Sequence, residues 1–146
     1  MRKKIVFIFL FLVININFVL AKSIKIIKTG YCDETIKVIE SGFSDITIKF
    51  TRNNSLADLK IGLTNDKSKA DYIIKREGFE TNTVKIIESG FADFTVKTTY
   101  SGFADLTIDI PDKGMVNLLI YTEDGFFERN DVIAVILPIL KMKAKK

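Results

Sequence analysis

The residues with the clearest capacity for chemistry are aspartates that recur along the chain behind an alanine or a serine. They are Asp45, Asp58, Asp71, Asp93 and Asp105. Stacked in a regular repeat, such carboxylates could form a ladder of oxygen ligands for Ca²⁺. Calcium-binding repeats, however, use glycine-rich nonapeptides to wrap the ion, and this sequence has no such run. We therefore expect no metal or other cofactor, and we expect each Asp to accept backbone N–H groups where a turn meets a strand.

Other catalytic chemistry is limited by composition. The chain has no histidine and a single cysteine, which excludes Ser-His-Asp, Cys-His and HExxH sites. Cys32 cannot form an intramolecular disulfide or a thiolate cluster, so we interpret it as a structural residue at a strand end, with an intermolecular disulfide as the alternative. The remaining enzymatic alternative is a small hydrolase that uses Glu40 or Glu88 with a neighbouring Asp.

The charges also restrict the partner. The chain contains 22 Lys and Arg against 18 Asp and Glu, a formal charge of +4. Three cations lie at residues 2–4 and four in the tail 141–146, which leaves 15 cations against 18 acids between them. Binding to nucleic acid requires a basic face, so this composition argues against a nucleic-acid partner.

Residues 1–21 have the features of a secretory signal peptide. Cations at residues 2–4 precede an apolar run that begins at Ile5, and residues 19–21 form a cleavage site of the usual small or medium residues. An uncleaved membrane anchor is the alternative, but the run is shorter than the roughly 20 apolar residues that a span needs. We therefore expect export to the periplasm or outside the cell, with a mature chain that begins at Lys22 and has no transmembrane span.

Internal repeats occupy residues 35–110. The sequence Ile-Glu-Ser-Gly-Phe-Ser-Asp-Ile-Thr-Ile-Lys begins at Ile39, a close copy begins at Ile87, and a shorter one begins at Tyr100. Weaker copies fill the gap between them. Aligning the copies on one β-branched position yields seven units: Ile36, Ile48, Ile61, Ile74, Val84, Val96 and Ile108.

Each unit alternates apolar and polar residues, which predicts short strands with one buried face. Thr47 and Lys49, for example, should lie on ordinary solvated sheet surface, opposite the apolar Ile48. We therefore predict an all-β repeat fold of about seven strands. Connections of about six residues allow either an antiparallel hairpin or an arch between two stacked sheets. A parallel neighbour in the same sheet is excluded, because that crossover needs about a dozen residues.

The turns favour the arch. A solvated hairpin tip rarely needs a phenylalanine, yet Phe43, Phe91 and Phe103 occupy the turns. We expect these rings to be buried at the end of a two-sheet core. A two-sheet β-roll or solenoid is therefore preferred over an antiparallel meander or an open barrel. Each ring follows a glycine that we expect to adopt a positive φ, namely Gly42, Gly90 and Gly102.

The repeated unit of strand, turn, Ala-Asp and strand, behind a signal peptide, resembles an uncharacterised family of short secreted bacterial β-repeat proteins with units of about 12 residues. The resemblance rests on Ala57-Asp58, Ala70-Asp71, Ala92-Asp93 and Ala104-Asp105, with Ser44-Asp45 as a variant. This chain uses Phe where that family favours Tyr, and it departs from the pattern after Pro111. The function of that family is unknown, so the resemblance implies only export and a repeat fold.

The segment after Pro111 is not repetitive. Residues 116–122 predict a strand, and the turn at Asp124 and Gly125 predicts a short C-terminal hairpin. Residues 132–137 fit either a short helix, capped by Asn130 and Asp131, or a buried strand, and either should stop at Pro138. We expect residues 132–140 to cover the open end of the repeat core. The alternative is a membrane-seeking or partner-docking segment followed by a basic tail.

These features predict four segments: a signal peptide (1–21), a β-repeat domain (22–110), a C-terminal hairpin and cap (111–140) and a basic tail (141–146). The predicted function is that of an exported, non-catalytic module with a structural or partner-binding role in the cell envelope or outside the cell. The partner would be an envelope or extracellular protein, or a second copy paired through exposed strand edges. The carboxylate-dependent hydrolase is the alternative.

Overall fold

The structure of the protein is a computed structural model that describes residues 20–146. The predicted signal peptide lies almost entirely outside the described residues. The first strand begins at Lys22, so cleavage after Ala21 would remove no part of any element of the fold.

The chain forms nine short strands and then one helix. The strands are β1 (Lys22–Ile27), β2 (Glu34–Ile39), β3 (Ile46–Thr51), β4 (Leu59–Leu63), β5 (Tyr72–Lys75), β6 (Thr83–Ile87), β7 (Phe94–Thr99), β8 (Leu106–Asp109) and β9 (Leu118–Thr122), and the helix is α1 (Arg129–Ala144). Two 3-10 turns, η1 (Asn54–Leu56) and η2 (Lys67–Lys69), lie in the connections on either side of β4.

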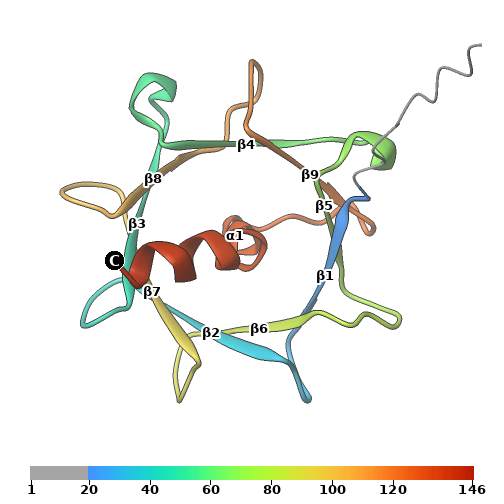
Figure 1. Ribbon diagram of the computed structural model, residues 1–146, viewed down its shortest axis with the longest axis horizontal. Helices are drawn as coiled ribbons and strands as arrows, with labels where there is room; N and C mark the ends of the chain where they lie inside the picture. Colours follow the sequence, from blue (N-terminus) through green and yellow to red (C-terminus); the bar gives the residue numbers. More distant parts are fainter. Residues whose placement is uncertain (1–19) are drawn as a thin grey trace, which may run out of the picture.

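All nine strands are parallel and close into one barrel in the order β1-β5-β9-β4-β8-β3-β7-β2-β6. Strands that are consecutive in sequence are never neighbours, because one other strand always lies between them. The chain thus travels around the barrel twice, and the second circuit fills the gaps left by the first (Figure 1). The predicted two-sheet roll of seven strands is therefore wrong, and so is the exclusion of parallel neighbours.

The register explains how short connections can join parallel strands. Ile27, at the end of β1, is level with Lys85 of β6, and Lys85 is level with Thr35 at the start of β2. The connection at residues 28–33 therefore moves sideways by two strand spacings, about 10 Å, and does not run back along a strand. The usual requirement for a long crossover applies to strands that start at the same level, and these do not.

The interior contains at least one large apolar residue from every strand. The seven aligned β-branched residues are each exposed by 2% or less, and Ile24 of β1 and Ile120 of β9 are similarly buried. Alternation within the strands is therefore confirmed as the source of the core. The strand predicted at residues 116–122 is confirmed as β9, whereas β1 was not predicted because it lies outside the Ala-Asp repeats.

The helix fills the lumen of the barrel. Every side chain from Val132 to Leu137 is buried, as is Leu140, and all of them belong to the same apolar cluster as the strand residues. A helix that is apolar all around is expected only where it is surrounded by protein. Figure 1 shows α1 inside the ring of strands. The segment predicted as a cap over the end of the core therefore forms its centre.

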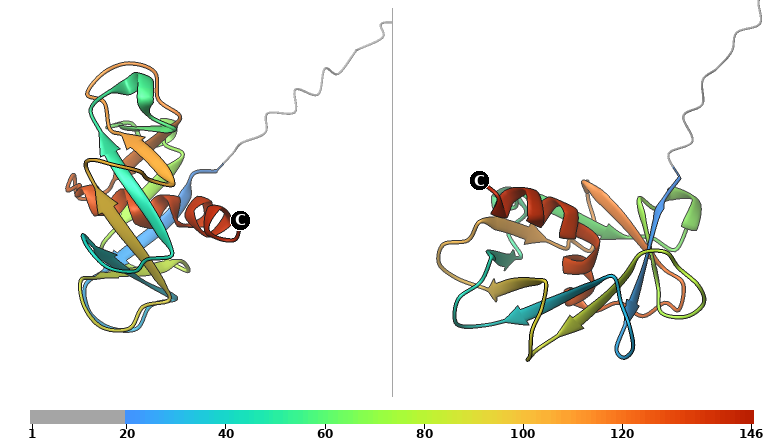
Figure 2. Two further views of the ribbon diagram at one scale, coloured as in Figure 1. Left: turned by 90° about the vertical axis from the view of Figure 1, so that its left-hand side faces the viewer. Right: turned by 60° about the horizontal axis from the view of Figure 1, so that its bottom comes forward.

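Two further expectations for the C-terminal region are wrong. β9 pairs only with the parallel strands β4 and β5, so no C-terminal hairpin forms. Pro138 lies inside α1 and does not end it. A proline there removes one backbone hydrogen bond and bends a helix, and α1 is visibly bent in Figure 2. The surrounding barrel wall stabilises the helix despite that loss.

Candidate functional site

The repeated Asp residues attach each connection to the strand that it crosses. The loop at residues 88–93 leads from β6 to β7 and passes over β2, which lies between them. The Asp93 N–H donates to the Thr35 carbonyl of β2 at 2.9 Å, and the Thr35 N–H donates to Asp93 Oδ2 at 2.7 Å. Farther along β2, Lys37 Nζ donates to the Gly90 carbonyl of the same loop at 3.1 Å. Thr35 and Lys37 of β2 thus hydrogen-bond to the loop that crosses them.

The same contact recurs around the barrel. Side-chain oxygens of the other repeated Asp residues accept backbone N–H groups at 2.7 to 2.8 Å: Asp45 from Thr95, Asp58 from Thr107, Asp71 from Leu119 and Asp105 from Thr47. The expectation that each Asp accepts a backbone N–H is confirmed. The donor, however, lies 48 to 58 residues away in the crossed strand and not in the turn of the Asp itself.

This arrangement changes the interpretation of the outer sheet face. Thr47 and Lys49 lie under the loop at residues 100–105, where Lys49 Nζ donates to the Gly102 carbonyl at 3.1 Å. They are not free solvated surface, contrary to expectation. Each of the five Asp residues is hydrogen-bonded to a different strand. Residues 20–146 contain no group of three or more Asp, Glu, Cys or His side chains arranged as a metal site.

The aromatic residues of the turns are exposed. Phe43, Phe91 and Phe103 are exposed by 101%, 103% and 90%, so the expectation that they are buried is wrong. The lumen is filled by α1 and the loops pass outside the barrel wall, so no second sheet encloses the rings. The positive φ predicted for the preceding glycines is confirmed, with values of 105° at Gly42 and 98° at Gly90 and 79° at Gly102.

Two further aromatic residues belong to this set: Phe79, in a weaker copy of the repeat, and Tyr31, which was not predicted from the sequence. Tyr31 is exposed by 92% and Phe79 by 88%, and each also follows a glycine with a positive φ. The signal was present, because residues 29–33 read Thr-Gly-Tyr-Cys-Asp and so match Ser-Gly-Phe-Ala-Asp. The loops that carry the five rings follow β7, β2, β6, β1 and β5, which are consecutive in the barrel. We call this set the aromatic arc: Tyr31, Phe43, Phe79, Phe91 and Phe103.

The loops of the aromatic arc are acidic. Residues 28–33, 40–45, 76–82, 88–93 and 100–105 contain eight Asp or Glu and two Lys or Arg. In Figure 1 these loops project outward from the ring over one continuous part of its circumference. The connections that contain η1 and η2 lie elsewhere on the rim.

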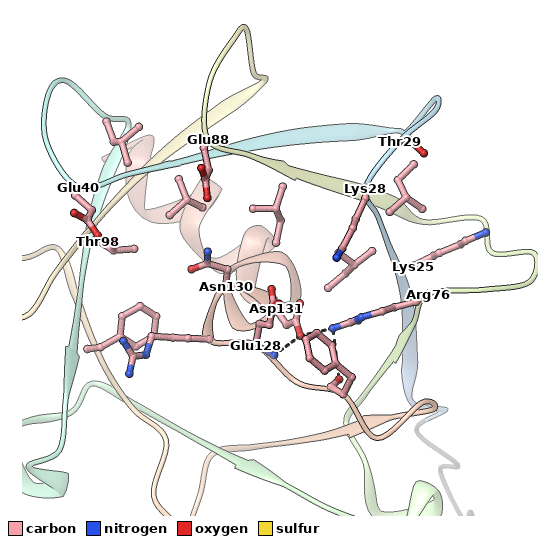
Figure 3. A pocket seen from close by; sticks show the side chains of 18 of the residues that line it. Lys25, Lys28, Thr29, Glu40, Arg76, Glu88, Thr98, Glu128, Asn130 and Asp131 are labelled. Atoms are coloured by element: carbon pink, nitrogen blue, oxygen red, sulfur yellow. Dashed lines mark hydrogen bonds and ion pairs between the residues drawn. The ribbon is translucent and has the colours of Figure 1, made fainter.

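A hollow of about 1340 Å³, which we call the mouth hollow, opens where the strands of the arc end (Figure 3). Half-buried Ile26, Val38 and Ile86 line its wall. Glu40 and Glu88 stand at its rim on the ends of the neighbouring strands β2 and β6. Neither carboxylate has a hydrogen bond or an ion pair with any described residue. The structure thus brings together the two glutamates that the hydrolase hypothesis named.

A buried ion pair closes one side of the mouth hollow. Asp131, in the first turn of α1, is exposed by 2% and lies 2.6 Å from an Arg76 guanidinium nitrogen. Burial raises the pKa of Asp131, whereas the Glu128 N–H and the Arg76 guanidinium act in the opposite direction. The Arg76 guanidinium also lies 5.0 Å from the centre of the Phe126 ring. Sequence analysis missed Arg76 because nothing local links it to a helix 53 residues later.

A second arginine occupies the far side of the mouth hollow. The Arg129 guanidinium lies 5.1 Å from the centres of both the Phe50 and the Tyr100 rings, and it donates to the Tyr100 hydroxyl. Lys28 lies on the wall formed by the end of β1 and has no ion pair with a described residue. The mouth hollow therefore has an acidic side without ion pairs, formed by Glu40 and Glu88, and cations without ion pairs among the described residues, such as Lys28 and Arg129.

Cys32 is half-buried, and its Sγ lies 3.4 Å from Thr35 Oγ1. It therefore lies beside the contact between a loop and a crossed strand and not in the mouth hollow. No helix within residues 20–146 is both long enough and apolar enough to cross a membrane.

Comparison with known proteins does not assign a family. No protein-family model matches the chain, and no curated protein matches its sequence. The resemblance to secreted repeat proteins stays a prediction from the sequence pattern.

Proposed function

We propose that the protein is an exported, non-catalytic binding module that holds a protein partner through its aromatic arc. The observation that carries the proposal is the exposure of five aromatic rings, each by 88% or more, on loops of five adjacent strands. Export rests on the signal-peptide pattern of residues 1–21.

Physical chemistry favours contact as the role of these rings. Exposing an aromatic side chain to water does not stabilise the fold, and grouped exposed apolar residues mark interaction sites. Ser, Gly and aromatic residues on short loops also resemble the composition of antibody paratopes. There, a ring supplies a large contact area while few rotatable bonds lose freedom.

The charge of the arc loops selects among partners. The arc loops contain eight acidic and two basic residues, and Lys25, Lys37 and Lys49 of the crossed strands donate to their carbonyls. The remaining acidic excess favours a partner with a basic contact face and opposes an anionic lipid surface. The absence of Trp makes stacking against sugars less favourable than contact with protein.

Site-specific photo-crosslinking in the native cell tests the proposal. A photoreactive residue at position 43 or 91 should yield one discrete protein adduct, and the same residue at position 112, on the opposite rim, should not. The partner identified from the adduct should bind the purified protein, and Phe43→Ser with Phe91→Ser should weaken that binding at least about tenfold. Equal crosslinking at all three positions, or unchanged binding by the double variant, would contradict the proposal.

One observation favours the hydrolase as a second candidate, because Glu40 and Glu88 line the same hollow. Acid–base pairs, however, need two carboxyls in different surroundings. These two glutamates are both exposed, and both begin the same Glu-Ser-Gly-Phe sequence. Hydrolysis of a glycan or peptide substrate that Glu40→Gln and Glu88→Gln each abolish would establish the enzyme instead.

A further inference from the structure

The two ends of α1 lie on opposite faces of the barrel. Its first turn borders the mouth hollow, where strands end. Near its other end, Lys141 pairs with Glu34 at the start of β2, and Lys143 Nζ donates at 3.1 Å to the carbonyl of Asp105, just before β8. Figure 2 shows the helix crossing the ring and ending outside it. Any contact between the two faces of different copies would therefore be head to tail.

The end of the helix forms a basic knob. Leu140 is the last buried residue, and the following six residues are Lys-Met-Lys-Ala-Lys-Lys. They include four cations and no acidic side chain, and Met142 is exposed by 64%. Lys141 and Lys143 are held by the barrel of their own chain, so Lys145 and Lys146 supply the ammonium groups that can reach another molecule. The proposed function does not use this segment, although it is the most concentrated charge in the described chain.

The mouth hollow complements this knob in size. A helix 10–12 Å wide that rises 5.4 Å per turn occupies about 500 Å³ per turn. The six residues beyond Leu140 therefore need about 800 Å³, and the hollow provides about 1340 Å³.

It also complements the knob in charge and polarity. The unpaired Glu40 and Glu88 can receive lysine ammonium groups, and the half-buried Ile26, Val38 and Ile86 can receive an apolar side chain such as Met142. Arg76 is already paired with Asp131. Arg129 keeps its charge but is stacked on the Phe50 and Tyr100 rings at the far side of the hollow, away from the two glutamates.

We propose that the basic knob, residues 141–146, docks into the mouth hollow of a second copy of the chain. Such an interface joins two different surfaces, so it propagates into an open chain of molecules or closes into a ring. The interface goes beyond the proposed function and does not depend on it: crosslinks from the aromatic arc to another protein would remain if copies did not associate.

Analytical ultracentrifugation of the exported protein over a wide concentration range tests the interface. The wild type should form oligomers larger than dimers in about 0.1 M NaCl and dissociate in about 1 M NaCl, where the Debye length falls from about 10 Å to about 3 Å. Lys145→Glu with Lys146→Glu should remain monomeric, and so should Glu40→Lys with Glu88→Lys. Matched reversals outside the interface, Asp112→Lys and Lys113→Glu, should associate like the wild type.

Mixing the two monomeric variants provides the sharpest test. Each variant retains one intact surface, and the reversed knob of one variant also complements the reversed hollow of the other in charge, so the mixture should associate although neither variant does so alone. Circular dichroism melts verify that all variants are folded. A wild type that stays monomeric at every concentration, or association that neither reversal weakens, or a mixture that stays monomeric would overturn the proposal. Association only with another protein would assign the mouth hollow to that partner instead.

Discussion

Asp93 and Thr35, 58 residues apart in sequence, exchange two hydrogen bonds: the Asp93 N–H donates to the Thr35 carbonyl at 2.9 Å, and the Thr35 N–H donates to the Asp93 carboxylate at 2.7 Å. This exchange attaches a loop to the strand beneath it. The same exchange recurs at other crossings, so the Asp of one repeat unit and the Thr of another together attach each loop to the strand that it crosses.

The first prediction concerns the acceptor in this pair. Asp93→Asn should change the free energy of unfolding by less than about 0.5 kcal/mol, because the amide oxygen can still accept, whereas Asp93→Ala should lose about 1–2 kcal/mol. Urea titration measures both, with Asp112→Ala as the exposed control. The melting temperature should not change between Ca²⁺ and chelator. A clear calcium-dependent rise would show that the Asp residues hold a metal.

The second prediction separates the arc from the core. Phe91→Ala should change the free energy of unfolding by less than about 0.5 kcal/mol, because the ring is fully exposed. Ile48→Ala should cost about 2–5 kcal/mol, because Ile48 is fully buried in the lumen. Denaturant melts of the two variants compare these sites directly. A loss above about 2 kcal/mol for Phe91→Ala would show that the ring packs against the protein.

The third prediction concerns the buried pair. Arg76→Met leaves Asp131 buried without its cation and should cost about 3–5 kcal/mol near neutral pH. Adding Asp131→Asn should recover much of that loss. Lys67→Met, which breaks the exposed pair with Glu123, should cost less than about 1 kcal/mol.

The pH dependence of the same pair has a defined sign. Burial raises the pKa of Asp131 above its ordinary value of 3.8, so the folded protein binds the proton more tightly than the unfolded chain does. The free energy of unfolding should therefore fall as pH rises from about 3.8 through the raised pKa, and in Arg76→Met this fall should be larger and extend to higher pH. Melts across this pH range, with Asp131→Asn lacking the dependence, measure it. A rise in stability over the same range in Arg76→Met would contradict the assignment.

The fourth prediction concerns Asp33, whose pKa is lowered from 3.8 chiefly by the Thr83 hydroxyl and secondarily by the Thr83 N–H. Thr83→Val removes the hydroxyl but keeps the backbone donor, so the pKa of Asp33 should move part of the way back toward 3.8. Carboxyl carbon shifts followed by NMR titration measure this change, and Asp112 serves as an internal reference. An unchanged Asp33 pKa would show that the hydroxyl bond does not form in solution.

Sequence was sufficient for the repeated strands, but it did not decide between helix and strand for residues 132–137 and did not predict how the strands pair. Alternation around Ile48 identified the strands and the core, because burial on one face imposes a period of two. Pairing was not predictable, because equivalent Thr-X-Lys and Gly-Phe-Ala-Asp segments leave open which loop crosses which strand. Closure of the barrel also depends on α1, whose apolar residues lie outside the repeats. The exposure of Phe91 was not predicted, because an aromatic residue with no role in the turn geometry was assumed to be buried in the core.

The two-circuit path has a consequence for how the protein folds. No strand of the first circuit, β1 to β4, pairs with another strand of that circuit. During synthesis the first strand pair that can form is β1 with β5, because the partner of Lys22 is Tyr72, 50 residues later in the chain. Sheets whose strand pairs are far apart in sequence form slowly, because the intervening chain must lose conformational entropy before the pairs form any stabilising contacts. No sheet can therefore form before β5 ends at Lys75, about half-way along the chain, and until then the N-terminal strands can cross a narrow channel as an extended polypeptide.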